Sequence, residues 1–135
     1  MVDEGRRRSM REYQKRRTAA RRNAGLVTRT VWIRREDAEA YFQAVAPLLD
    51  HARIIEAVIG SVTVSPVEIV DIIRKHSLAY DPEDIIFLTR LHETLTLKPD
   101  DYDKTIDRAK QIITRYGLSI TAEDLMRSGL RASDT

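Results

Sequence analysis

Residues 26–33 read LVTRTVWI, and this stretch decides the fold that the sequence predicts. β-branched and aromatic side chains dominate it and alternate with a period near two, the pattern of a β-strand. One face of that strand would carry Val27, Arg29, Val31 and Ile33. The opposite face would carry Thr28, Thr30 and Trp32. We therefore expect one strand here, close to the start of the chain.

This strand needs a partner, because an isolated strand is not stable in water. Two short apolar segments of the same chain, residues 62–64 and 95–97, could pair with it. A copy of residues 26–33 in a second chain is the third candidate. The sequence leaves the choice open.

Helix signals fill the rest of the chain. Ser9 with Glu12 and Thr121 with Asp124 have capping-box spacing, and three prolines follow helix-start residues at Pro66, Pro82 and Pro99. Glycines that can end helices stand at Gly25, Gly60 and Gly117. These signals predict a basic helix over 9–24 and a last helix over 121–130, whereas Pro47 leaves open one kinked helix or two. The expected fold is mainly α with one short N-terminal β-strand.

Charge is distributed unevenly along the chain. Residues 1–35 hold twelve Arg and Lys against three acids, a net charge of +9, and the remainder holds 11 bases against 18 acids, a net charge of −7. Such asymmetry is typical of a basic arm that meets a polyanion. Arginine predominates in the arm, and its planar fork matches phosphate oxygens. The candidate phosphate-binding residues are Arg6, Arg7, Arg8, Arg11, Lys15, Arg16, Arg17, Arg21 and Arg22.

Several kinds of chemistry find no support in the sequence. The chain has no cysteine, no nucleophile elbow and no glycine-rich phosphate loop. Its histidines, His51, His76 and His92, lack the spacing of metal ligands. No apolar run approaches the roughly 20 residues that a membrane-spanning helix needs. We expect a soluble, cytoplasmic, non-enzymatic protein without metal or cofactor.

One resemblance sharpens this interpretation. The strand ending in TVWI (30–33), followed at once by RREDAEA (34–40) and an amphipathic helix, resembles ribbon-helix-helix DNA-binding proteins. The preceding REYQKRR (11–17) is similar to the basic lead-in of small bacterial antitoxin-like members of that group. The resemblance covers about residues 11–60. Two positions depart from the pattern, because Arg29 stands on the inner face and Arg34 stands where proline commonly ends the strand.

The resemblance implies a homodimer whose antiparallel strands form a ribbon in the major groove of duplex DNA. Bases would then be read by Thr28, Thr30 and Trp32. It also implies a transcriptional regulator or plasmid-maintenance accessory factor. The organisation would be a basic arm and helix (1–25), a strand-helix-helix DNA-binding element (26–60) and an acidic helical region (61–135). The acidic region would be a small helical bundle that packs with residues 26–60 as one compact domain, and it could contact a protein partner.

Two other functions remain open on the sequence alone. The basic arm could dock an acidic protein, so that the chain would serve as an interaction or scaffold protein. It could instead be an arginine-rich helix that binds RNA.

Overall fold

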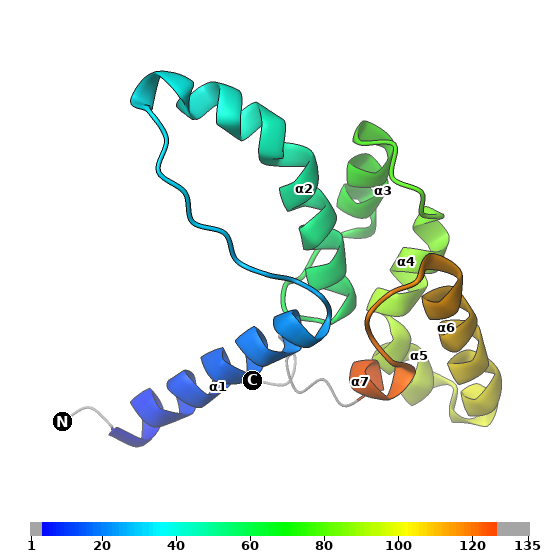
Figure 1. Cartoon of the computed structure of the whole chain (residues 1–135). Coiled ribbons are helices and arrows are strands. Elements are labelled where there is room, and N and C mark those ends of the chain that lie inside the picture. Colours follow the sequence, from blue (N-terminus) through cyan, green and yellow to red (C-terminus); the bar gives the residue numbers. More distant parts are fainter. Residues whose placement is uncertain (1–3, 127–135) are drawn as a thin grey trace.

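The structure is a computed structural model that describes residues 4–126 (Figure 1). Within that range the chain forms seven α-helices and two 3-10 turns, and it contains no strand. The helices are α1 (Glu4–Asn23), α2 (Ala38–Val58), α3 (Pro66–Lys75), α4 (Pro82–Thr89), α5 (Leu91–Leu97), α6 (Tyr102–Tyr116) and α7 (Ala122–Met126), with the turns η1 (Arg35–Asp37) and η2 (Pro99–Asp101). None of these helices is long and apolar enough to cross a bilayer.

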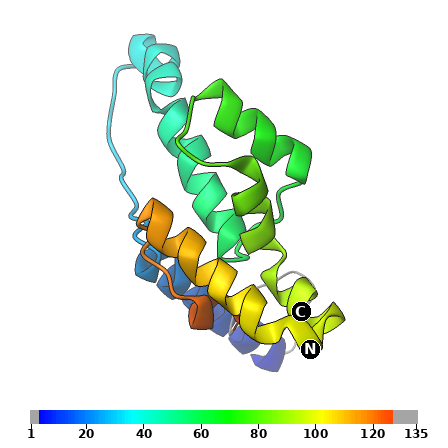
Figure 2. The same cartoon turned by 90° about the vertical axis from the view of Figure 1, so that its right-hand side faces the viewer.

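The core forms where α3 and α4 pack on the C-terminal half of α2 (Figure 2). The helices α5, α6 and α7 pack on one another, and α5 and α6 also pack on α4. Burial of branched apolar side chains supplies most of the driving force for this packing. The largest fully buried side chains are Ile54, Ile69, Ile85, Leu88, Leu91, Ile112, Leu125 and Val58. Figure 1 also shows α1 and the N-terminal half of α2 reaching away from this core.

The helix starts predicted at Ser65, Asp81 and Thr121 are confirmed. The Ser65 hydroxyl accepts a hydrogen bond from the Glu68 amide at 3.2 Å, and the Asp81 carboxylate accepts one from the Glu83 amide at 3.0 Å. The box of Thr121 and Asp124 closes in both directions, each bond at 3.1 Å. Each side chain thereby satisfies an amide that the first turn of a helix leaves free.

The predicted end of the basic helix at Gly25 is also confirmed. Gly25 adopts a φ of +88°, and its amide donates to Arg22 O while the Leu26 amide donates to Arg21 O. This pair of bonds is the Schellman arrangement, which needs a left-handed residue after the helix. A Cβ at Gly25 would also meet Ser119 Oγ at 3.4 Å, so glycine suits both the conformation and the close approach.

The predicted strand over residues 26–33 is wrong, and with it the ribbon-helix-helix element. Residues 26–34 form an extended link from α1 to α2. Its backbone bonds are local ones at its two ends, from Leu26 to Arg21 O and from Asp37 to Arg34 O, and none pairs residues 27–33 with another described segment. Residues 95–97, one proposed partner, lie in α5, and residues 62–64 form an irregular link. Strand propensity reflects fit to a pleated, half-buried surface. No such surface exists beside this segment within residues 4–126.

Two helix boundaries differ from those expected. α1 already includes Glu4, so Ser9 and Glu12 lie inside it and do not cap it. α2 runs without interruption through Pro47. Proline there removes the bond to Gln43 O, but both residues are exposed, so water can take its place. Residues 127–130 of the last expected helix lie outside the described residues.

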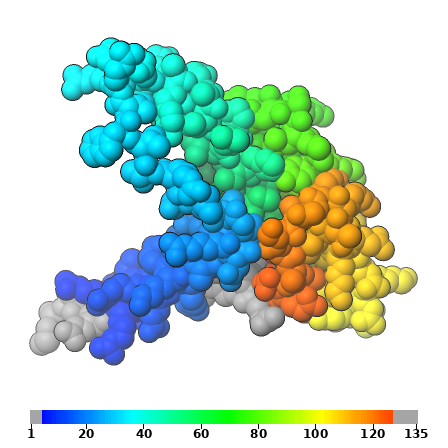
Figure 3. All heavy atoms as spheres, viewed as in Figure 1, coloured from blue at the N-terminus to red at the C-terminus, as the bar shows by residue number. Residues whose placement is uncertain are grey.

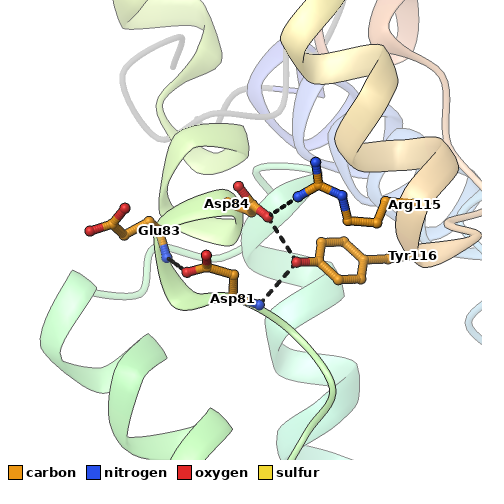
Figure 4. A network of polar contacts seen from close by, with 5 residues as sticks. All are labelled: Asp81, Glu83, Asp84, Arg115 and Tyr116. Atoms are coloured by element: carbon orange, nitrogen blue, oxygen red, sulfur yellow. Dashed lines mark hydrogen bonds and ion pairs between the residues drawn. The ribbon is translucent and has the colours of Figure 1, made fainter.

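A polar network joins the start of α4 to the end of α6 (Figure 4). The carboxylate of Asp84, which is only 7% exposed, accepts hydrogen bonds from Arg115 Nη1 and Tyr116 Oη, both at 2.8 Å. The Asp81 amide donates to Tyr116 Oη at 3.0 Å. The buried charge is thus both paired and hydrogen-bonded, as a low-dielectric site requires.

Tyr80 extends this cluster toward α2. Its burial can be tested by measuring stability at alkaline pH. Its ring lies edge-on to Tyr116 and its hydroxyl lies 2.6 Å from His51 Nε2. Burial, with a smaller contribution from Tyr116, raises the pKa of Tyr80 above its ordinary value of 10.0. The folded state therefore holds this proton more tightly than the unfolded state.

We expect the associated stability to be complete below pH 10 and to be lost as the pH rises through the higher folded pKa. The Tyr80→Phe variant should lose less stability between about pH 9 and 11 than the unmodified protein. Urea unfolding midpoints across that range provide the measurement. Parallel curves for the two proteins would show that Tyr80 carries no such linkage.

Candidate nucleic-acid interface

Helix α1 is free along its first half and anchored along its second. Every residue from 5 to 12 is exposed, and burial begins at Tyr13. Toward the C-terminus one side of the helix packs on the core through Ala20 and Ala24. Figure 1 shows the free half projecting away from the other helices.

Two of the candidate phosphate-binding arginines point inward and hold α1 to the rest of the protein. Arg17 Nη2 donates to the backbone carbonyl of Ser61 at 2.8 Å. Arg21 Nη2 forms an ion pair with Glu56 Oε2 on α2 at 3.0 Å. A hydrogen bond from a charged donor contributes about 1.5–3 kcal/mol. These two side chains therefore serve as tethers, and their charges are already engaged.

The opposite side of α1 carries a row of cations, which we call the outer basic stripe: Arg8, Arg11, Lys15 and Arg22. All four side chains are exposed. At 3.6 residues per turn they fall within about 60° of one another and about 160° from the centre of the anchored side. The stripe runs from Arg8 to Arg22, a distance of about 21 Å along the helix. One exposed acid, Glu12, lies beside the stripe, about 40° from Arg8 around the helix.

The remaining candidate arginines flank this stripe. Arg6, Arg7 and Arg16 are exposed, and Arg16 lies over the ring of Tyr13 at 6.0 Å. Between Lys15 and Arg22 the surface is slightly hollowed, because Thr18 and Ala19 are small. Gln14 and Asn23 border the same hollow with amide groups. The stripe thus combines cations with neutral hydrogen-bond donors.

The three residues predicted to read bases lie on the extended link. Thr28, Thr30 and Trp32 are all exposed, and no part of the Trp32 side chain is covered. Without a paired strand they do not form one face of a ribbon. Figure 3 shows the link and the outer end of α2 standing above α1, with a notch between them.

Two histidines have hydrogen-bond partners that sequence spacing did not indicate. His76 Nε2 lies 2.6 Å from Asp50 Oδ2 and its side chain is buried, while His51 contacts Tyr80. Both pairs join α2 to residues between the end of α3 and the start of α4. Among residues 4–126, no group of three or more potential ligand residues could hold a metal ion.

Four of the nine predicted phosphate-binding residues therefore lie together on the outer basic stripe of α1, while the predicted base-reading residues lie apart from it on the link. Comparisons of the chain with protein-family models, with curated proteins and with solved structures find no match.

Proposed function

We propose that this protein binds duplex DNA through the phosphate backbone, with the outer basic stripe of α1 as its contact surface. This proposal rests on the way the charged side chains are divided between the two sides of α1. Its inward arginines are engaged by Ser61 and Glu56, whereas the stripe faces solvent with no described acidic partner. A row of cations creates a positive potential that attracts a polyanion and raises its local concentration.

The dimensions of α1 support this assignment. An α-helix with its side chains is about 10–12 Å wide, close to the roughly 12 Å width of the major groove. The stripe is long enough to follow several phosphates. Each contact releases a bound counterion and so contributes to affinity independently of base sequence. The protein acts as a binding protein of the cytoplasm and not as an enzyme.

Phosphate contacts position a protein but carry no sequence information. Any sequence preference would come from exposed side chains near the end of α1, and Thr28, Thr30 and Trp32 lie on the segment that follows it. A role in transcription regulation or plasmid maintenance would depend on that preference.

Competition binding distinguishes this proposal from its two alternatives. The intact chain is bound to a fluorescent DNA duplex and then titrated with unlabelled duplex DNA, structured RNA or polyglutamate at equal charge concentration. We expect duplex DNA to displace the probe at the lowest concentration. Stronger displacement by RNA would favour the arginine-rich RNA-binding function, and stronger displacement by polyglutamate would favour an acidic protein partner.

A further inference from the structure

Helix α2 is covered by other helices only in its C-terminal half, where Ile54, Ala57 and Val58 are buried. One side packs on α3 and α4 through Ile54 and its neighbours, and Asp50 and Arg53 pair with His76 and Glu68 on that flank. The other side is covered only near its C-terminal end, where Arg21 of α1 meets Glu56.

The rest of this second side forms what we call the outer apolar face, in which Val45 and Ala52 are half-buried and the other residues are exposed: Ala38, Tyr41, Phe42, Val45, Leu48, Leu49 and Ala52. Phe42 is 67% exposed and Leu48 is 68% exposed. Helical geometry places all seven residues within about 120° of one another. The face carries no charged side chain. It continues, on the same side of the helix, the surface on which α1 packs.

The extended link adds to this apolar surface. Val31, Trp32 and Ile33 are exposed just before α2 begins. Figure 3 shows the link and the outer end of α2 as one projection. The charged residues 34–37 lie between Ile33 and α2 in the sequence. Exposed apolar side chains gathered in one region often mark an interaction site.

The order of residues along the outer apolar face is symmetric about Val45. Three residues away on either side stand Phe42 and Leu48, four away stand Tyr41 and Leu49, and seven away stand Ala38 and Ala52. An interface with two-fold symmetry requires a surface that is its own complement. Two such helices crossing antiparallel at Val45 would pair large residues with large ones and alanine with alanine.

We propose that the outer apolar face binds the same face of a second copy of this chain, forming an antiparallel α2–α2 homodimer centred on Val45. Because the outer apolar face carries no charge, two identical faces can meet without electrostatic repulsion. An uncharged face also has no cation with which to bind a phosphate backbone. A stable dimer buries about 800 Å² per partner. Exposed Trp32 and Ile33 on the link add apolar surface beside the face. Trp and Tyr are residues on which binding energy often concentrates.

This homodimer goes beyond the proposed DNA binding and does not depend on it. In a dimer, two outer basic stripes would be presented by one particle, which increases avidity for a long polyanion. The interface itself can be tested without nucleic acid, so its failure would leave the DNA proposal untouched.

Sedimentation velocity of the intact chain, without nucleic acid, should show a dimer. The double variant Phe42→Arg with Leu49→Arg should sediment as a monomer while keeping its helical circular dichroism. The matched control is Val67→Arg with Leu97→Arg, two residues that are 70% and 79% exposed away from this face, and it should remain a dimer. A monomeric unmodified chain, or a double variant that still dimerises, would overturn the proposal.

Crosslinking keeps the test decisive if the double variant does not fold. Because the chain has no cysteine, Val45→Cys introduces a single thiol at the centre of the proposed symmetry axis. A short bis-maleimide should join two Val45→Cys chains in high yield and two Leu97→Cys chains poorly. Equal yields at the two positions would overturn the antiparallel arrangement.

Discussion

Replacing Arg11, Lys15 and Arg22 together by glutamine is expected to weaken binding to duplex DNA by about two to three orders of magnitude at ~0.1 M salt. The three side chains are exposed on the outer basic stripe and are separated from the anchored side of α1. Glutamine keeps helix propensity, so the helix should persist. What is lost is the release of about three counterions. Fluorescence anisotropy with a labelled duplex measures the change.

A second triple variant separates location from net charge. Arg74, Lys75 and Lys104 are exposed cations on α3 and α6, and their replacement by glutamine removes the same three charges. This control should change affinity by less than about tenfold, because its charges lie away from α1 and are screened over a Debye length. An equal loss in both variants would mean that overall charge, and not the stripe, determines binding.

Leu88→Ala is expected to lower the free energy of unfolding by about 3–5 kcal/mol. Leu88 on α4 is fully buried among the residues of the central core, so the substitution removes apolar contacts and leaves a cavity. Because domains of this kind are stable by about 5–15 kcal/mol, the loss is a large share of the total. Urea unfolding followed by circular dichroism provides the measurement.

The control for this substitution uses the same chemistry at the surface. Leu97, at the end of α5, is 79% exposed, and Leu97→Ala should change stability by no more than about 0.5 kcal/mol. Both variants are compared at one protein concentration, because dimerisation would make stability concentration-dependent. A loss near 1 kcal/mol for Leu88→Ala would contradict the assignment of the core.

Helix boundaries could be predicted from the sequence where local chemistry decides them. Ser65 and Asp81 cap helices through amides two or three residues away, and Gly25 ends α1 through bonds to the preceding turn. Such interactions require only a few neighbouring residues. The predictions at these positions therefore hold whatever the tertiary structure is.

The strand could not be judged in the same way. Residues 26–33 have a composition that suits a sheet, but a strand forms only if a second segment supplies the other half of its hydrogen bonds. No described segment does so. The composition favoured a strand with Val27, Val31 and Ile33 on its inner face, whereas all three are exposed on an unpaired link.

The candidate site was only partly accessible from the sequence for a related reason. Counting cations on α1 identified the basic arm, but the separation of Arg17 and Arg21 from the stripe depends on where Ser61 and Glu56 lie. Periodicity likewise predicted an apolar side for the first half of α2. It could not show that the fold leaves this side uncovered, because that follows from where α1 and α3 pack.

The salt dependence of duplex binding tests the central claim most directly. The logarithm of the association constant of the intact chain is measured against the logarithm of salt concentration. If the four cations of the outer basic stripe contact phosphates, the slope should be about −3.6 for each α1 that engages the duplex. A slope near zero, or no binding at low salt, would contradict the assignment of the stripe as a phosphate-binding surface.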